Sequence, residues 1–318
     1  MANLTVVTGF LLMGFSNTWE LQVLHAILFL LIYLVALMGN LLIFTLISLD
    51  GKLHTPMYFF LKNLSFLDLC LVSVTVPKSI ANSLSNSYSI TFWECVSQLF
   101  LMMLFAASEL FLLTVMSYDR YVAICQPLHY EVIMNSETCV KMVTTSWLTG
   151  GFFGVLYAVS TFTLPFCGSK KIHQFFCDVP ALLRISCSDS HLTVDVIMVL
   201  AFSLGIFCSI YITISYSHII STVLKIPIKE SRSKAFSTCL PHLIVFTFFI
   251  TTGVVAYLMP PQESDTVLHL LLSMFYTVVP PTLNPVIYSL RNKDMKTSLR
   301  KLTAWKYFSK GLIPKFFP

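Results

Sequence analysis

The sequence is short of charge. Only 11% of its 318 residues are Asp, Glu, Lys or Arg, whereas soluble domains carry about 25%. Hydrophobic residues make up 56% of the chain. A soluble protein of this composition would have to expose large apolar surfaces and would aggregate. The scarcity of charge therefore excludes an ordinary soluble domain and favours a membrane protein.

Motifs that carry catalysis are also missing. The sequence contains no Gly-rich phosphate loop, no His-Glu-x-x-His, no Gly-x-Ser-x-Gly and no cysteine pair with the spacing of zinc ligands. His173 lies near Cys177, but a loop histidine is far more often a polar surface residue than a metal ligand. We therefore expect neither an enzyme nor a metal site.

Long apolar segments are abundant instead. A membrane-spanning helix needs about 20 apolar residues, and seven segments qualify, although Pro280, Pro281 and Pro285 interrupt the last. Such prolines are tolerated where neighbouring helices satisfy the freed carbonyls. We predict an all-α membrane protein, a seven-transmembrane helix bundle over residues 24–290, with an N-terminal segment (1–23) and a C-terminal tail (291–318). The expected helices cover about residues 24–48, 57–79, 95–121, 140–161, 194–223, 236–259 and 269–290.

The basic residues predict the orientation. With the N-terminus extracellular and the C-terminus cytoplasmic, sixteen of the 20 Lys and Arg lie on the inner side, where positive charge is retained. The net charge of +5 is then a topology signal and does not indicate nucleic-acid binding. Residues 1–23 show no cleavable signal peptide, so the first helix would direct insertion. The Asn3-Leu4-Thr5 motif predicts glycosylation of Asn3, whereas Asn63 lies on the inner side, out of reach.

The expected compartment sorts the nine cysteines. Four lie on the outer side, where disulfides persist, and they allow three pairings. The sequence alone leaves all three open. These four are Cys95, Cys167, Cys177 and Cys187. The other five are expected to be free thiols that pack as small hydrophobic groups, namely Cys70, Cys125, Cys139, Cys208 and Cys239.

Several polar residues interrupt apolar segments. Asp119 and Arg120 follow more than twenty almost uninterrupted apolar residues, so they mark where a helix meets water. Deeper polar groups should face the bundle interior and find partners there. Two carboxylates close together need a shared proton or cation. We therefore predict a shared proton or a bound cation near Asp68 and Glu109. A purely structural hydrogen-bonded network is the alternative. The deep polar residues are Asn40, Asp68, Glu109 and Asn284.

Five sequence motifs occur in order along the chain. They are Leu53-His-Thr-Pro-Met-Tyr-Phe-Phe-Leu61, Leu64-Ser-Phe-Leu-Asp68, Met116-Ser-Tyr-Asp-Arg-Tyr-Val-Ala-Ile-Cys125, Lys234-Ala-Phe-Ser-Thr-Cys239 and Pro280-Pro-Thr-Leu-Asn-Pro-Val-Ile-Tyr-Ser-Leu-Arg-Asn292. The set resembles the signature of vertebrate olfactory receptors of the tetrapod (class II) branch, which are rhodopsin-like (class A) G-protein-coupled receptors. The segment Ile172-His-Gln-Phe-Phe-Cys-Asp-Val-Pro180 is similar to the family-14 group.

The resemblance implies roles for matching residues. Asp119 and Arg120 would form an inactive-state latch, and Tyr216 and Tyr288 would receive Arg120 when helix six swings out. Asn40, Asp68 and Asn284 would form the inner polar network together with Glu109. The disulfides would be Cys95–Cys177 and Cys167–Cys187. Residues expected in switching and G-protein coupling are Asp119, Arg120, Tyr216, Arg232, Lys234, Asn284, Pro285 and Tyr288.

The chain departs from the family pattern in a few places. Helix six reads Phe249-Ile250-Thr251 where Phe-Tyr-Gly is common, so a hydroxyl is missing from the expected pocket floor. Ser117 replaces a common alanine, Pro241 a common serine and Gly9 a common glutamate. The change at Ile250 and Thr251 therefore alters the expected floor of the pocket.

Helical spacing of three and four residues predicts a ligand pocket in the outer half of the bundle. Tyr257 and Thr277 would offer hydroxyls, and Met102 stands where amine receptors hold an acid. Such a lining suits a small, volatile, mostly apolar molecule, although ordinary interhelical packing is the alternative for each position. The expected lining residues are Met102, Met103, Ala106, Ala107, Leu110, Leu200, Leu204, Gly205, Val254, Tyr257 and Thr277.

The resemblance implies an odorant receptor that activates a heterotrimeric G protein of the stimulatory olfactory type and raises cyclic AMP. It would be a multi-pass protein of the plasma membrane of olfactory cilia, with membrane lipid as a further partner. A short amphipathic helix is expected over residues 293–303 on the inner leaflet. The rivals are a non-olfactory class A receptor for another small hydrophobic ligand and a transporter, which would show internal repeats; none is found.

Overall fold

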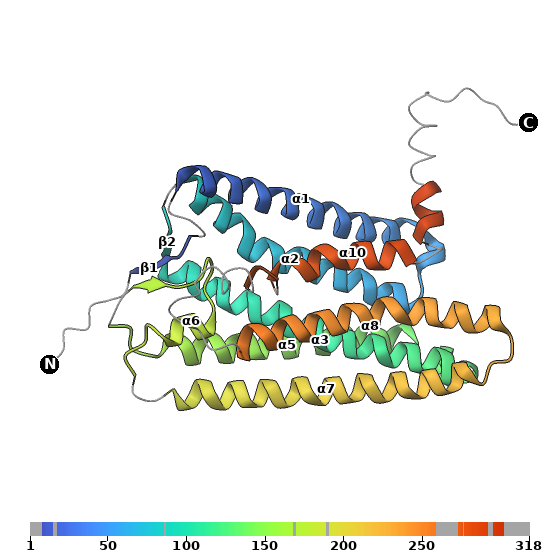
Figure 1. Cartoon of the computed structure of the whole chain (residues 1–318). Coiled ribbons are helices and arrows are strands. Elements are labelled where there is room, and N and C mark those ends of the chain that lie inside the picture. The colour runs from blue at the N-terminus through green and yellow to red at the C-terminus, as the bar shows by residue number, and fades with distance from the viewer. Residues whose placement is uncertain are drawn as a thin grey trace, which may run out of the picture.

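The computed structural model describes residues 8–14, 18–85, 87–167, 170–188, 191–258, 273–275, 277–291 and 295–301. Long helices lie side by side and form one bundle (Figure 1). This arrangement confirms the predicted helical membrane bundle. In chain order the principal helices are α1 (Trp19–Leu49), α2 (Pro56–Ser85), α3 (Phe92–Cys125), α5 (Ser136–Phe162), α7 (Leu192–Leu224), α8 (Lys229–Leu258) and α10 (Val279–Arg291).

Six of these helices are long and apolar enough to cross a membrane, with mean hydropathy of 1.3 to 2.7 in their most apolar windows. They are α1, α2, α3, α5, α7 and residues Ala235–Val255 of α8. The outer faces of α1 and α7 carry exposed apolar side chains such as Leu31, Val35 and Phe207, as expected for helices in contact with lipid. The seventh helix, α10, has 13 residues and packs against α1, α2 and α8; residues 269–272 of the expected segment lie outside the described residues.

The helices extend beyond their apolar segments. Helix α3 begins at Phe92, three residues before the expected start, because Thr91 and Glu94 form a capping box. The Glu94 amide donates to Thr91 Oγ1 at 3.3 Å, and the Thr91 amide donates to Glu94 Oε2 at 2.9 Å. Helix α1 likewise begins at Trp19 rather than near residue 24. Hydropathy detects the part of a helix that suits lipid and misses the polar turns at its ends.

Three short strands at one end of the bundle were not predicted. Strand β1 (Gly9–Leu12) pairs antiparallel with β2 (Ser89–Thr91) and parallel with β3 (Lys171–Ile172). A Cβ at Gly9 would lie 2.6 Å from the Ile90 carbonyl oxygen, so this pairing requires glycine. We call this end of the molecule the β-sheet end.

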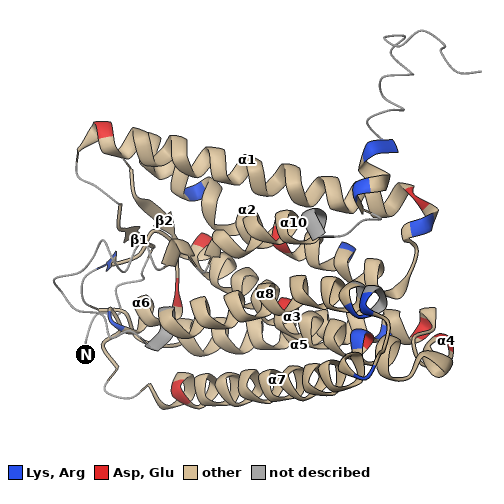
Figure 2. Cartoon of the chain, turned by 45° about the vertical axis from the view of Figure 1, so that its right-hand side comes forward, with Lys and Arg blue, Asp and Glu red and all other residues tan. Residues whose placement is uncertain are grey.

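The opposite end carries η1 (Gly51–Leu53), η2 (Pro127–His129) and α4 (Tyr130–Ile133), and we call it the α4 end. Most Lys and Arg gather there (Figure 2). Residues 295–301 are also helical, as the tail prediction proposed for this region. Met295 is buried in the core, and Ser298 donates to Asp50 Oδ2 at 2.6 Å.

Glycines allow α3 and α5 to approach closely. Gly150 and Gly154 are spaced as in small-xxx-small helix contacts. A Cβ at Gly154 would lie 2.9 Å from the Phe100 carbonyl oxygen, whereas a Cβ at Gly151 would meet nothing within 4 Å. The α3–α5 contact therefore depends on the small residues on one face of α5.

Candidate ligand cavity and latch

A cavity of about 310 Å³ lies inside the bundle, in the half nearer the β-sheet end. Helices α3, α5, α7 and α8 supply most of its wall, and α2 and Thr277 complete it. Met102, Phe153 and Tyr157 are buried lining residues. The sequence-predicted residues that line it are Met102, Met103, Ala106, Ala107, Leu110, Leu204, Gly205, Val254 and Thr277.

Two expected lining residues stand apart. Leu200 does not line the cavity: its side chain is 51% exposed on the outer face of α7. The α7 residues that line the cavity are Ala201, Phe202, Leu204, Gly205, Ile206 and Ser209, so the expected Leu204 and Gly205 are among them and Leu200 is not. The side chain of Tyr257 lies outside the described residues.

Sequence reasoning missed the wall supplied by α5. Phe153 and Tyr157 face the cavity four residues apart, and this aromatic pair beside the small Gly154 was the available signal. Ile250 lines the cavity, so the departure from the family pattern falls on the wall itself. Thr251 does not line it: its side chain is exposed on α8, and its hydroxyl donates to the Thr247 carbonyl at 2.7 Å. The other lining residues that were not predicted are Leu71, Phe111, Ala201, Phe202, Ile206, Ser209, Phe249 and Gly253.

The cavity is apolar with a few hydroxyls. None of the described lining residues is charged. Ser209 and Thr277 donate their hydroxyl protons to helix carbonyls at 2.8 and 2.7 Å, so each keeps lone pairs that accept a hydrogen bond. Together with Tyr157, they give the wall three polar points in an otherwise hydrocarbon surface.

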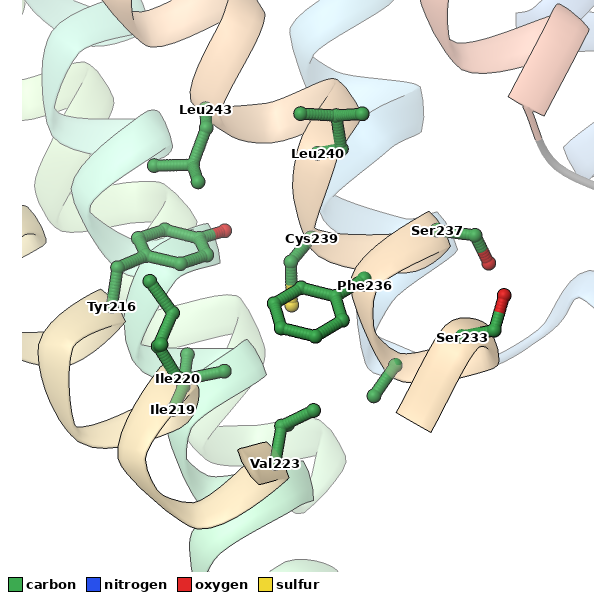
Figure 3. Close-up of a pocket in the computed structure, with 11 residues that line it drawn as sticks. Tyr216, Ile219, Ile220, Val223, Ser233, Phe236, Ser237, Cys239, Leu240 and Leu243 are labelled. Carbon is green, nitrogen blue, oxygen red and sulfur yellow. The ribbon is translucent and has the colours of Figure 1, made fainter. Parts of the chain in front are cut away.

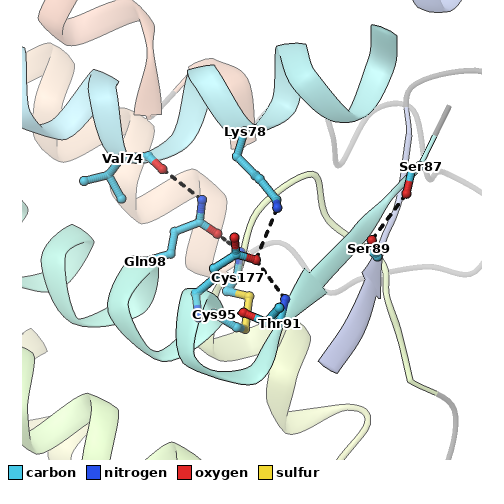
Figure 4. A network of polar contacts seen from close by, with 9 residues as sticks. Val74, Lys78, Ser87, Ser89, Thr91, Cys95, Gln98 and Cys177 are labelled. Carbon is cyan, nitrogen blue, oxygen red and sulfur yellow. Dashed lines mark hydrogen bonds and ion pairs between the residues drawn. A yellow bond between two sulfur atoms is a disulfide. The ribbon is translucent and has the colours of Figure 1, made fainter. Parts of the chain in front are cut away.

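Polar contacts and a disulfide hold the β-sheet end together (Figure 4). Cys95 of α3 is bonded to Cys177, with their Cα atoms 5.5 Å apart. Gln98 lies one turn below, where its Nε2 donates to the Val74 carbonyl at 2.9 Å and its Oε1 accepts from the Cys177 amide at 2.8 Å. Lys78 pairs with Glu94 at 3.2 Å. This network fixes the loop that follows β3 against α2 and α3.

The second disulfide joins Cys167 and Cys187, with their Cα atoms 5.9 Å apart. Both bonds are therefore the ones that the motif resemblance implied, and the five remaining cysteines are free thiols in the structure.

Asp119 and Arg120, the residues expected to form a latch, are paired at the α4 end. Arg120 donates from Nη2 and Nε to Asp119 Oδ2, at 2.7 and 3.1 Å. The other oxygen, Oδ1, accepts from the Tyr130 hydroxyl at 2.7 Å. Burial, with the nearby Asp119 carboxylate, raises the pKa of Tyr130, so this residue stays a neutral donor. Tyr130 was not predicted, because α4 is too short to be recognised from its sequence.

Tyr216 takes part in a different contact from the one expected. Its hydroxyl lies 3.0 Å from His242 Nδ1, and His242 Nε2 lies 2.9 Å from the Leu113 carbonyl oxygen. A carbonyl only accepts, so Nε2 carries the proton and Nδ1 of the neutral ring accepts from Tyr216. This Tyr216–His242–Leu113 strut joins α7, α8 and α3. The buried hydroxyl of Tyr288 has no hydrogen-bond partner among the described residues, so neither tyrosine holds Arg120 in this conformation.

Three buried polar residues meet between the cavity and the latch. The Asn284 amide donates to both Asp68 oxygens at 3.0 and 3.1 Å and lies 3.4 Å from Glu109 Oε1. Both carboxyl groups are fully buried. One amide does not neutralise two carboxylates, so the pair needs a proton or cation if both are to remain there. No group of three or more His, Cys, Asp and Glu placed to hold a metal occurs among the described residues.

The Asn40 side chain donates a hydrogen bond to the backbone of α10 and not to these carboxylates. Its amide donates to the Pro281 carbonyl at 2.8 Å and to the Ala36 carbonyl at 3.0 Å. Pro285 lacks the N–H that would bond the Pro281 carbonyl four residues earlier. Asn40 therefore replaces the hydrogen bond that Pro285 removes.

Comparison with known proteins decides the family. The olfactory receptor family model matches residues 29–306. The chain belongs to the olfactory receptor family. Human olfactory receptor 14A2 is 60% identical over 307 residues, which cover 96% of this chain and 98% of that protein. Human olfactory receptor 14A16 is 57% identical over 310 residues, which cover 98% and 100%.

The fold of this olfactory receptor is that of rhodopsin. Squid rhodopsin, in a crystal structure, superposes with a TM-score of 0.70 over 92% of this chain and 88% of its own, at 18% identity. The receptor is thus a multi-pass membrane protein of the class A fold. Arg232 lies part-buried near the start of α8. Asn3 and the side chain of Lys234 lie outside the described residues.

Proposed function

We propose that this receptor binds a small, mostly apolar odorant in the cavity between α3, α5, α7 and α8. The cavity itself carries the proposal: about 310 Å³, lined by apolar side chains and three hydroxyls, without a charged lining residue among those described. Ligand pockets span about 300–1,000 Å³, so this one suits a ligand at the small end. Burial of apolar surface would supply the affinity, and a hydroxyl of Tyr157, Ser209 or Thr277 would orient one polar atom.

The β-sheet end would face outward and the α4 end the cytoplasm. The gathering of Lys and Arg at the α4 end supports this orientation (Figure 2), as do the two disulfides at the β-sheet end. Asn3 would then carry glycan. By family membership, the receptor would work in the plasma membrane of olfactory cilia.

The mechanism is a shift between two populations. In the closed form Asp119 holds Arg120, and the Tyr216–His242–Leu113 strut ties α8 to α3. An odorant that binds the open form better than the closed one moves the equilibrium by its difference in affinity. When α8 moves out, Tyr216 would leave His242. Tyr216 and the hydroxyl of Tyr288, which has no hydrogen-bond partner among the described residues, would then receive Arg120. Arg120, Arg232 and Lys234 then frame the site for the G protein.

The Asp68–Glu109–Asn284 cluster would link the ligand cavity to the Asp119–Arg120 latch. Glu109 precedes Leu110 and Phe111 of the cavity wall, and Asn284 lies in the helix that also carries Tyr288. A proton or cation shared between the two carboxyl groups would stabilise one packing of α2, α3 and α10 over another.

A cyclic AMP assay in cells that express the receptor tests the proposal against a panel of volatile molecules. The expected result is a response to one or more small, weakly polar volatiles, through the stimulatory olfactory G protein. Arg120→Ala should abolish that response while the receptor stays at the cell surface. A full response by Arg120→Ala would contradict the latch, and a response only to non-volatile hydrophobic ligands would favour the rival class A receptor.

A further inference from the structure

A second cavity, of about 390 Å³, lies between the α4-end halves of α7 and α8 (Figure 3). We call it the α7–α8 groove. It shares no lining residue with the odorant cavity. Apolar side chains from both helices form its walls, principally Ile219, Ile220, Val223, Phe236, Leu240 and Leu243.

The groove runs from the bundle interior to the outer surface. Tyr216 and Cys239 at its inner side are 3% and 4% exposed, whereas Ile220, Phe236 and Leu240 are 40%, 39% and 37% exposed. These partly exposed apolar residues lie on two of the helices that are long and apolar enough to cross a membrane. The groove is therefore open toward the hydrocarbon of the membrane.

Serines line the α4 end of the groove, and basic residues flank it in the sequence, although none of the described Lys and Arg lines it. Ser233 and Ser237 are among the lining residues, and in Figure 3 their hydroxyls lie near each other on the side of α8 away from Tyr216. The segment 225–234 contains four Lys and Arg and one acidic residue. Of the four, Lys225 and Lys229 are exposed and Arg232 is part-buried beside Ser233. An apolar groove with serines at its α4 end and basic residues nearby in the chain fits a hydrocarbon chain attached to an anionic head.

We propose that the α7–α8 groove binds an anionic glycerophospholipid of the inner leaflet, with one acyl chain between α7 and α8 and the phosphate at Arg232 and Ser233. The proposal rests on the orientation given under the proposed function, since the inner leaflet is the one rich in anionic lipid. It does not depend on which odorant the receptor binds.

The position of the groove predicts an effect on signalling. Its inner wall includes Tyr216, whose hydroxyl is part of the strut that keeps α8 against α3. A lipid that fits the groove in this closed form binds the closed form better than the open one. By population shift the lipid lowers ligand-independent signalling and raises the odorant concentration needed for a response.

Full-length receptor in lipid nanodiscs tests the binding. The discs contain phosphatidylcholine with or without phosphatidylserine, and the retained lipid is measured by mass spectrometry after exchange into detergent. Ile220→Trp fills the groove. Ile214→Trp is its matched control, because Ile214 lies on the same helix, is 52% exposed and does not line the groove. We expect retained phosphatidylserine to fall to the phosphatidylcholine level in Ile220→Trp and to stay at the wild-type level in Ile214→Trp.

Two charge variants keep the test independent of any packing defect. Arg232→Gln should weaken phosphatidylserine retention about fivefold. Ser233→Asp adds a negative charge at an exposed position and should weaken it similarly. Equal retention of phosphatidylserine in Ile220→Trp and Ile214→Trp overturns the proposal. So does equal retention of neutral and anionic lipid, or a loss of G-protein coupling in Ile220→Trp with retained lipid unchanged, which would assign the groove to the G protein.

The lipid measurement uses no odorant, so its failure leaves the odorant proposal standing. Both proposals assume that the α4 end faces the cytoplasm. An epitope inserted at the α4 end tests this orientation separately, by antibody labelling of intact and of permeabilised cells.

Discussion

The Tyr216–His242–Leu113 strut should restrain the receptor in its closed form, and His242→Phe removes its hydrogen bonds. The rings of Tyr216 and His242 are stacked with centroids 5.6 Å apart, and phenylalanine preserves that packing. It cannot donate to Leu113 or accept from Tyr216. Each such bond contributes about 0.5–1.5 kcal/mol, so the closed form should lose about 2 kcal/mol relative to the open one.

That loss has a measurable consequence. If about 1% of receptors are open without ligand, about 2 kcal/mol raises the open fraction to about 20%. Ligand-independent cyclic AMP, normalised to receptor at the cell surface, should rise accordingly. Arg120→Ala in the same chain should return it to background, because an open receptor still needs Arg120.

His218→Phe is the matched control. His218 lies on α7 and is exposed, and its ring contacts Tyr121 outside the strut. It should leave ligand-independent cyclic AMP unchanged. An unchanged signal in His242→Phe at wild-type surface level would refute the restraint, and an equal rise in both variants would show that the effect is not specific to the strut.

Three further predictions concern stability. Asn40→Leu leaves the Pro281 carbonyl unbonded and should destabilise the receptor by about 1–3 kcal/mol, measured as a lower Tm; Pro285→Ala in the same chain should restore it by supplying the missing N–H. Gly154→Leu should lower Tm and surface expression, because overpacking costs about 1–3 kcal/mol, whereas Gly151→Leu should be neutral. The hydrogen bond from Ser298, followed by that from the Lys52 amide, lowers the pKa of the Asp50 carboxyl group below its ordinary value of 3.8. The ionised Asp50 carboxylate therefore stabilises the folded form above about pH 4. This stabilisation is lost as the pH falls through the lowered pKa of Asp50. Hydrogen exchange in residues 295–301 should therefore show an acid-dependent opening that Asp50→Asn lacks, and an identical pH profile in the two proteins would contradict it.

The sequence predicts the helical segments well, because a membrane requires about 20 apolar residues per span and that pattern is long. It also predicts the α3 side of the cavity, where Met102, Ala106 and Leu110 follow helical spacing. It fails at Leu200, which shares a helical face with Leu204 but is 51% exposed and does not line the cavity, because periodicity tells which residues share a face and not how far along that face the cavity extends. The aromatic wall of Phe153 and Tyr157 depends on how closely α5 approaches α3, which only the packing at Gly150 and Gly154 decides.

The sequence does not predict contacts between short elements that lie far apart in the chain. Strand β1 has four residues, and its pairing with two separate loops leaves no periodic pattern. Tyr130 contacts Asp119, and His242 contacts Tyr216 and Leu113, only once the helices are assembled. Their sequence neighbourhoods do not identify these partners.

The most direct test of odorant binding in the α3–α5–α7–α8 cavity compares two substitutions on one helix. Leu204 lines the cavity, and Leu200, one turn earlier, is 51% exposed on the outer face of α7. With an odorant that activates the wild type, Leu204→Trp should abolish the cyclic AMP response at wild-type surface expression, and Leu200→Trp should leave it unchanged. An undiminished response in Leu204→Trp, or equal loss in both variants, would contradict binding in this cavity.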